Sequence, residues 1–156
     1  MEIRFARESD IPAMIDLLKQ VGQVHHEIRP DLFRAGAQKY DENVLTALLA
    51  DSRRPILIAE TAGRVAGYAF CILQITENDP VLCDRKVLYL DDLCVDEGSR
   101  GQGVATALYQ RVLEYAREIG CNAVTLNVWC GNDGAMRFYE KSGLKPQKVG
   151  MEMILC

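Results

Sequence analysis

The residues with the clearest chemical potential lie in one short glycine-bearing segment, Arg100–Thr106. An apolar run, Val87–Val95, precedes it, and a run with helical periodicity, Gln102–Ile119, follows it. A turn between a strand and a helix start presents free backbone N–H groups, and the helix dipole favours negative charge there. Glycines let the backbone approach a phosphate closely, and Arg100 adds a positive charge. The segment therefore predicts a binding site for a phosphate-bearing ligand.

Three classes of phosphate site share this general pattern. A P-loop requires Gly-Lys followed by Ser or Thr, and the sequence contains no such run. A dinucleotide fingerprint requires a third small residue where this chain has Thr106, and the next strand-like run, Asn122–Val128, has no terminal acid for a ribose. The third class, R/Q-x-x-G-x-G/A, is matched by Arg100, Gly103 and Ala105.

A second segment, Asn132–Leu144, follows the pattern N-x-x-A-x-x-F-Y-E-K-x-G-F except that Leu144 replaces the final aromatic residue. Asn132 can cap the helix that follows it, and Gly143 fits a left-handed helix C-cap. Together, and in this order, the two segments resemble the cofactor-binding segments of the GNAT superfamily of N-acetyltransferases. The resemblance covers essentially the whole chain, although the first half matches only in pattern.

The resemblance implies a fold and an activity. The expected fold is α/β (α+β), a single N-acetyltransferase domain over residues 1–156 with a mixed twisted sheet of about six to seven strands and helices on both faces. The implied activity is acetyl-CoA-dependent transfer of acetyl to a primary amine of a small molecule or peptide, by direct attack in a ternary complex. The alternative is a non-catalytic acyl-CoA-binding sensor or regulatory module. A homodimer is a family-level expectation.

The resemblance also assigns the positions that bind acetyl-CoA. The backbone of the central strand would pair with pantetheine like an added strand, and the glycine turn would hold the pyrophosphate. The cofactor-binding positions are Leu93, Cys94, Val95, Arg100, Gly101, Gln102, Gly103, Val104, Ala105, Thr106, Asn132 and Ala135.

Acetyl transfer requires deprotonation of an ammonium, stabilisation of an oxyanion and protonation of the departing sulfur. By resemblance, Tyr139 matches the family tyrosine that protonates the sulfur. The alternative is a core tyrosine packed beside Phe138, in which case Tyr89, on the strand leading to the thioester, is the fallback.

Two adjacent acids, Asp91 and Asp92, interrupt an apolar strand. Strand alternation predicts that they point to opposite faces, and at least one should line a wet cavity because an unpaired charge is costly in a core. Asp91 matches the position of a catalytic Glu in relatives, so we expect it to be the general base. Alternatively, Asp91 only orients substrate or a loop. Asp92 is expected to be structural, capping a neighbouring loop.

The acceptor site is expected beside an irregular segment, residues 22–37, that contains His25 and His26. In relatives this segment walls the acceptor site, although a solvated loop is an equal alternative. The expected substrate-side residues are His25, His26, Asp92 and Tyr89. Trp129 could line the same mouth or fill the core.

Composition excludes several other classes of function. The 156 residues are 49% hydrophobic and carry a net charge of −4, which predicts neither a nucleic-acid partner nor an anionic membrane partner. No run approaches the roughly 18 apolar residues of a membrane span, and no signal-peptide pattern is present. The six cysteines lack C-x-x-C spacing, and the two histidines are adjacent, so we expect reduced thiols, no metal site and a cytoplasmic location.

Hydrophobic periodicity predicts the elements that must position these residues. Strands are expected at 2–6, 55–60, 65–76, 86–95, 122–128 and 150–155. Helices are expected from a cap at Ser9 or Asp10, with Pro12 in the first turn, and at 41–50, 102–119 and 132–142.

Overall fold

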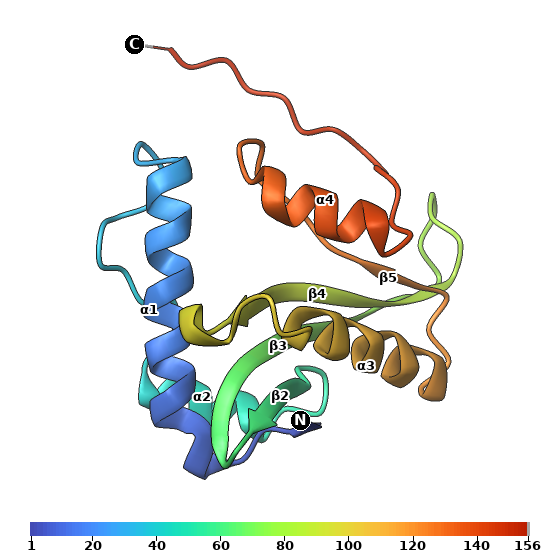
Figure 1. Cartoon of the computed structure of the whole chain (residues 1–156). Coiled ribbons are helices and arrows are strands. Elements are labelled where there is room, and N and C mark those ends of the chain that lie inside the picture. Colours follow the sequence, from blue (N-terminus) through green and yellow to red (C-terminus); the bar gives the residue numbers. More distant parts are fainter. Residues whose placement is uncertain (156) are drawn as a thin grey trace.

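The computed structural model describes residues 1–155 and is built on a five-stranded sheet. The strands are β1 (Glu2–Phe5), β2 (Ile56–Thr61), β3 (Arg64–Thr76), β4 (Arg85–Val95) and β5 (Ala123–Thr125), in the order β1-β2-β3-β4-β5. All neighbouring strands are antiparallel except β4 and β5, which are parallel (Figure 1). The predicted mixed α/β fold is confirmed, with five strands rather than the expected six or seven.

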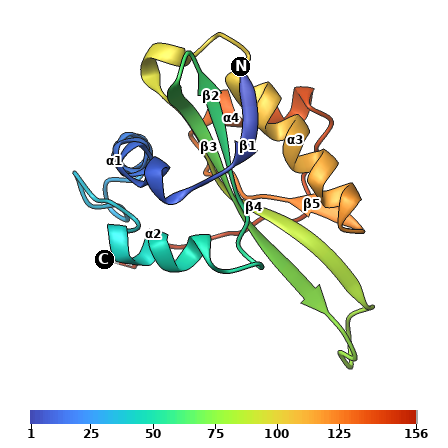
Figure 2. The same cartoon turned by 90° about the horizontal axis from the view of Figure 1, so that it is seen from below.

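Helices cover both faces of this sheet, as expected. On one face lie α1 (Ile11–Ile28) and α2 (Glu42–Leu49), and on the other lies α3 (Val104–Glu118), with α4 (Asp133–Lys141) beyond it (Figure 2). Two 3-10 turns, η1 (Glu8–Asp10) and η2 (Glu97–Ser99), precede α1 and α3. Within residues 1–155, no helix is long and apolar enough to cross a membrane.

Strand alternation divides the apolar side chains between two cores. In β2, Leu57 and Ala59 pack toward α3, whereas Ile56 and Ile58 pack toward α1 and α2. Leu108 and Val112 of α3 are fully buried against the first core, and Met14 of α1 against the second. The central strands are therefore apolar on both faces, which is why they appear as nearly continuous apolar runs in the sequence.

Three predicted elements differ from the structure. Residues 150–155, expected to form a last strand, pair with no strand among the described residues, and their backbone runs along the surface. The segment expected to be irregular from residue 22 is helical as far as Ile28, because its polar residues form the exposed side of α1, whose C-cap is Arg29, just before Pro30. The strand expected at 122–128 is limited to Ala123–Thr125.

Asp10 does not cap α1 with its side chain, contrary to expectation. Its buried carboxylate instead accepts two hydrogen bonds from Arg4, at 2.8 and 2.9 Å, and one from the Arg7 amide at 2.8 Å. Arg4 also contacts Glu60 at 2.7 Å, so the network joins β1, β2 and the start of α1. Hydrogen bonding from Arg4, opposed by burial, holds the pKa of Asp10 below its usual value.

Candidate active site

The parallel pair β4–β5 separates halfway along β4. Its last paired residues are Tyr89 and Thr125, whereas β4 stays paired with β3 as far as Val95. Along Leu90–Val95, β4 therefore has no strand partner on its β5 side within the described part of the chain. An extended ligand can add to such an edge through backbone hydrogen bonds, and this stretch contains the expected pantetheine positions Leu93, Cys94 and Val95.

The glycine turn follows the end of β4, where the sequence predicted it. Gly101 and Gly103 have φ values of 75° and 79°, in the left-handed region, and Gly103 is the N-cap of α3. A Cβ atom built on either glycine would meet no atom within 4 Å, so the space above the turn is open. The first amides of a helix have no intrahelical partner, and the exposed Arg100 lies beside them. This cradle fits a pyrophosphate.

Gly67 in β3 is a positioning residue that the sequence analysis missed. A Cβ there would lie 2.7 Å from the Cys94 carbonyl oxygen and 3.2 Å from the side chains of Val104 and Leu108. Only glycine therefore lets the start of α3 lie this close to the β3–β4 pair. A glycine inside a strand pattern is the signal that could have indicated a close approach.

The two strand acids point to the same face, and the expectation of opposite faces was wrong. Phe70 of β3 pairs with Asp92, but the next residue, Cys71, pairs with Leu90, so Asp91 is an extra residue in a β-bulge. A bulge breaks the alternation of side chains. Both carboxylates therefore reach partners on the α1–α2 side of the sheet.

Asp92 accepts a hydrogen bond of 2.7 Å from the hydroxyl of Tyr68, a fully buried residue of β3. Burial raises the pKa of Asp92 above its usual value, although the Tyr68 hydrogen bond and the charge of Lys39 oppose this shift. Burial and the Asp92 charge also raise the pKa of Tyr68, which is therefore a neutral donor. The sequence analysis did not identify Tyr68, because nothing in its spacing indicated a polar partner.

Asp91 holds an ammonium group. Lys39, from the loop between α1 and α2, places its Nζ 2.6 Å from an Asp91 carboxylate oxygen and 5.2 Å from the centre of the Tyr40 ring. Burial is the largest single influence and lowers the pKa of Lys39, but the hydrogen bond that Lys39 donates to Asp91 and the negative charge around it together outweigh burial, so the net shift is upward. Lys39 was also missed by the sequence analysis. Its side chain is 45% exposed, so the ammonium lies at the surface of the site.

Tyr139 projects from α4 and packs edge-on against Tyr109 and Phe138, with ring centroids 5.9 and 5.0 Å away. No hydrogen bond within residues 1–155 involves its hydroxyl, and no buried side-chain oxygen there lacks a partner, so the hydroxyl reaches open space. Burial, followed by the charge of Asp92, raises the pKa of Tyr139. The phenol is neutral and able to donate. The fallback, Tyr89, accepts a hydrogen bond of 3.2 Å from Asn127.

Asn132 caps α4 as expected, because its side-chain oxygen accepts a hydrogen bond of 3.2 Å from the Ala135 amide. Leu144, which replaces an aromatic residue of the family pattern, packs against the same core as Tyr139. The departure from the pattern therefore preserves an apolar contact at the end of α4.

Aromatic residues wall the site beside the end of α1. His25 and His26 lie on the last turns of α1 rather than in a loop. The His25 and Phe33 rings are 5.0 Å apart, and Phe33 meets Trp129, which follows β5, edge-on at 5.4 Å. A 2.6 Å contact between His26 Nδ1 and the Phe33 carbonyl oxygen fixes this loop. Trp129 is 41% exposed and therefore does not fill the core.

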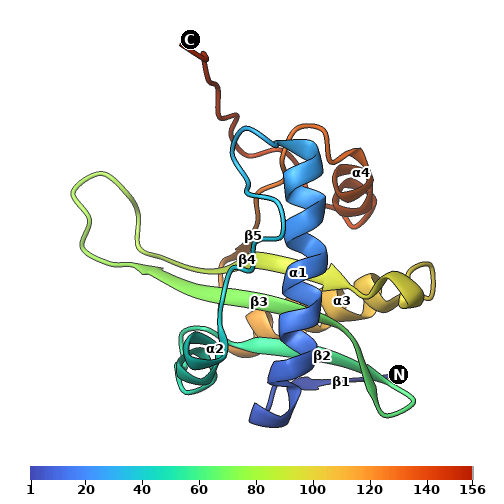
Figure 3. The same cartoon turned by 90° about the vertical axis from the view of Figure 1, so that its left-hand side faces the viewer.

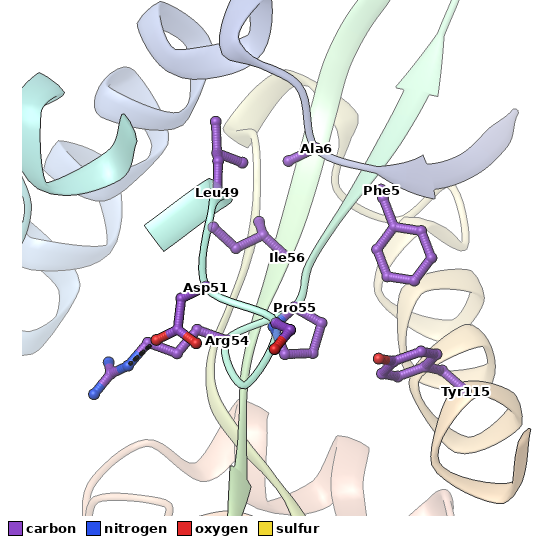
Figure 4. A pocket seen from close by; sticks show the side chains of 9 residues that line it. Phe5, Ala6, Leu49, Asp51, Arg54, Pro55, Ile56 and Tyr115 are labelled. Atoms are coloured by element: carbon purple, nitrogen blue, oxygen red, sulfur yellow. Dashed lines mark ion pairs between the residues drawn. The ribbon is translucent and has the colours of Figure 1, made fainter. Parts of the chain in front are cut away.

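A separate hollow of about 270 Å³ lies at the opposite edge of the sheet (Figure 4). Phe5 of β1 and Tyr115 of α3 border it on one side, and Leu49 of α2 and the Asp51–Arg54 ion pair lie on the other. None of the residues expected for acetyl transfer lines it. We therefore place the candidate active site at the open β4 edge and not in this hollow.

Comparison with known proteins agrees with this geometry. Residues 21–144 match the sequence model of the Acetyltransferase (GNAT) family. An uncharacterized N-acetyltransferase of Methanocaldococcus jannaschii is 32% identical over 59% of this chain and 39% of that protein. Another, from Mycobacterium bovis, is 38% identical over 62% of this chain and 56% of that protein. The chain thus spans about half the length of these curated relatives or less.

Other relatives match along nearly their full length. The glucosamine 6-phosphate N-acetyltransferase of Trypanosoma brucei brucei is 27% identical over 99% of this chain and 96% of that protein. A mutant of the BH1408 protein from Bacillus halodurans has a TM-score of 0.95 at 29% identity, covering 100% of both chains. An aminoglycoside N-acetyltransferase solved with CoA has a TM-score of 0.72 at 17% identity over 99% of this chain and 100% of that one, which shows the fold alone. The chain belongs to the GNAT acetyltransferase family, which uses acetyl-CoA.

Proposed function

We propose that this chain is an acetyl-CoA-dependent N-acetyltransferase that acetylates a primary amine of a small molecule or peptide within a ternary complex. One observation carries the proposal. The open edge of β4 contains Asp91 and Asp92 and leads into a phosphate cradle at Gly103, and Tyr139 of α4 supplies a neutral phenol suited to proton transfer. The same edge thus offers a place for the donor and the groups that its chemistry requires.

The residues of the cradle would bind acetyl-CoA as substrate. Backbone amides from Gly101 to Thr106, together with Arg100, would hold the pyrophosphate, and the β4 edge at Leu93–Val95 would hold the pantetheine arm. Asn132 would keep the start of α4 in place beside it. The acceptor amine attacks the thioester carbonyl carbon, a C–N bond forms, and the C–S bond breaks.

Asp91 is our proposed general base, acting directly or through a water. The Lys39 ammonium shows that its carboxylate can hold a cationic amine at hydrogen-bond distance, and an acceptor ammonium would take the same position. Asp92 is already engaged by Tyr68 and would act as a positioning residue. Tyr139 would give its phenolic proton to the departing thiolate, since it is neutral and its hydroxyl is free.

The state of Cys94 supports direct attack rather than transfer through an acetyl-cysteine. Cys94 lies on the β4 edge, but its thiol faces α1 and contacts the Leu17 carbonyl oxygen at 3.5 Å. Burial raises its pKa to about 12, so it is a neutral thiol at physiological pH. A neutral thiol is a poor nucleophile. The acceptor amine itself is therefore the better attacking group.

The wall formed by Phe33 and Trp129, together with two carboxylates, favours a cationic acceptor with an apolar or sugar-like face. Amino sugars head the test panel, because relatives carry the names glucosamine 6-phosphate N-acetyltransferase and aminoglycoside N-acetyltransferase. Polyamines, amino acids and peptide N-termini complete it.

The decisive experiment measures thiol release from acetyl-CoA across this amine panel, with mass detection of the acetylated amine. We expect release that depends on one amine class and falls sharply in Tyr139→Phe. Mass spectrometry of the protein after acetyl-CoA alone should show no acetyl adduct. If acetyl-CoA raised the Tm but no amine supported release, the chain would instead be a sensor on the same fold. If acetyl-CoA left the Tm unchanged, both proposals would fail.

A further inference from the structure

The side chain of Gln20, near the middle of α1, hydrogen-bonds to the segment that connects β4 with the phosphate cradle. Its amide nitrogen donates to Asp96 Oδ1 at 2.9 Å, and its amide oxygen accepts from the Glu97 backbone amide at 3.2 Å. The partners dictate this orientation, because a carboxylate only accepts and a backbone N–H only donates. Within residues 1–155, Gln20 is the one side chain from outside segment 96–103 that hydrogen-bonds to it.

Asp96 extends this contact into the turn that precedes the cradle. Its second carboxylate oxygen accepts from the Gly98 amide at 3.1 Å, which makes Asp96 the N-cap of η2. Its own backbone amide donates to the Ala66 carbonyl oxygen at 2.9 Å, so Asp96 is also fixed to β3. Figure 3 shows the end of β4 passing behind α1 before the chain turns into η2 and α3. One carboxylate therefore joins α1 to the chain just before the glycine turn.

Helix α1 is a well-fixed base for this contact. Leu17 and Leu18, just before Gln20, are buried in the core on the α1–α2 side of the sheet. The thiol of Cys94 contacts the Leu17 carbonyl oxygen at 3.5 Å, which ties α1 to the end of β4 at a second point. A side chain on a packed helix positions its partners more precisely than one on a loop.

The glycine turn itself has few contacts that could hold it. Gly101 and Gly103 have left-handed φ values, and no atom lies within 4 Å of the position of a Cβ on either residue. Glycine loses the most conformational freedom when it becomes ordered, and a ligand that must order a loop binds more weakly. A fixed point immediately before the turn lowers this entropic penalty.

We propose that Gln20 is a positioning residue for acetyl-CoA: its side-chain amide holds Asp96 and the Glu97 amide, so that the turn from Gly101 to Gly103 is set before the pyrophosphate binds. The inference rests on the proposed function, because it takes this turn as the pyrophosphate site. Gln20 makes no hydrogen bond to the turn itself and therefore acts through Asp96 and η2.

Calorimetry with CoA on the full chain and its variants is the first test. Gln20→Met keeps the length of the side chain but removes both hydrogen bonds, and should weaken CoA binding roughly tenfold. The matched control is Gln23→Met, because Gln23 lies on the exposed side of the same helix and bonds only to Glu27, at 3.2 Å. Its CoA affinity should equal that of the wild type. A folded Gln20→Met variant with wild-type CoA affinity would overturn the proposal.

An exchange of donor and acceptor separates positioning from simple charge effects. Asp96→Asn removes a negative charge, so charge alone predicts tighter binding of the anionic CoA, whereas positioning predicts weaker binding because a hydrogen bond is lost. Gln20→Glu/Asp96→Asn has the net charge of the wild type and reverses the direction of the Gln20–Asp96 hydrogen bond. Its CoA affinity should return to within about threefold of the wild type. A double variant that binds CoA no better than both single variants would refute the role of Gln20.

Kinetics supply a readout that a merely structural role would not give. With an amine that supports turnover, Gln20→Met should raise the acetyl-CoA KM but leave kcat and the acceptor KM near wild type. A lower kcat at an unchanged acetyl-CoA KM would overturn the proposal. If the wild type bound CoA but acetylated no amine, the proposed function would fail, while a tenfold loss of CoA affinity in Gln20→Met would still support positioning. A wild type that did not bind CoA would refute both.

Discussion

Replacing Gly103 with Asp tests the proposed phosphate cradle most directly. Gly103 has a φ of 79°, and a Cβ there would meet no atom within 4 Å, so a side chain can enter the space without steric conflict. Asn and Asp tolerate the left-handed region better than other non-glycine residues, at a cost of about 1 kcal/mol each in stability. Gly103→Asn and Gly103→Asp therefore share shape and strain and differ only in charge.

The magnitude follows from that charge. One carboxylate about 4 Å from one phosphate charge is repelled by about 1 kcal/mol in bulk water and about 4 kcal/mol at the effective dielectric constant of a protein surface. The turn is exposed, so we expect about 2 kcal/mol between the two variants. This corresponds to roughly thirtyfold weaker CoA binding by Gly103→Asp than by Gly103→Asn.

Isothermal titration calorimetry with CoA measures both affinities, and their ratio should decrease as salt screens the repulsion. Gly120 supplies the control, because it has a φ of 74°, is equally open and lies at the other end of α3, about 25 Å away along the helix axis. Gly120→Asp should leave CoA affinity unchanged. Equal affinities for Gly103→Asn and Gly103→Asp at low salt would refute the placement of the pyrophosphate.

Four other substitutions test the proposed site residues and the buried ion pair of Asp10. Tyr139→Phe should keep the fold and CoA affinity but lower kcat by about 10²–10⁴-fold, and a wild-type kcat with chemistry rate-limiting would remove Tyr139 from the mechanism. Asp91→Asn should lower kcat/KM more than Asp92→Asn does, and the reverse result would exchange their roles. Asp10→Asn should cost about 3 kcal/mol at pH 7 in urea unfolding, because it removes the buried carboxylate charge that pairs with the half-buried Arg4. The pKa of Asp10 is lower in the folded state than its unfolded value of about 3.9. The stability that this carboxylate contributes is therefore present above the unfolded pKa and is lost as pH falls through the folded pKa. A difference in unfolding free energy between the wild type and Asp10→Asn that persists in acid would contradict this role of Asp10.

Local sequence was enough to predict the backbone conformation of the two segments that we assign to the cofactor. Gly101 and Gly103 adopt left-handed backbone conformations that favour glycine, and Asn132 caps the helix that follows it. Both features can therefore be predicted from residue type and short spacing. The burial of both faces of the central strands is also visible in the sequence, because a nearly continuous apolar run between turn signals is typical of a strand that helices cover on both sides.

Long-range pairing decided what the sequence could not show. The bulge at Asp91 depends on the register between β3 and β4, and that register is set by the whole ladder, so simple alternation predicted the wrong face. The partners of the two acids, Lys39 and Tyr68, come from a distant loop and a neighbouring strand, 52 and 24 residues away.

The last predicted strand illustrates the same division. The apolar alternation of Val149–Leu155 is a property of the sequence, but the strand predicted from it was wrong for the described chain, because a strand exists only with a partner and none lies beside this segment. Gly67 is similar, because its necessity appears only when β3, β4 and α3 come within 3.2 Å of its missing Cβ. Sequence determines conformations that depend on neighbours along the chain, whereas contacts between distant segments exist only in the tertiary structure, because their distances are set by packing.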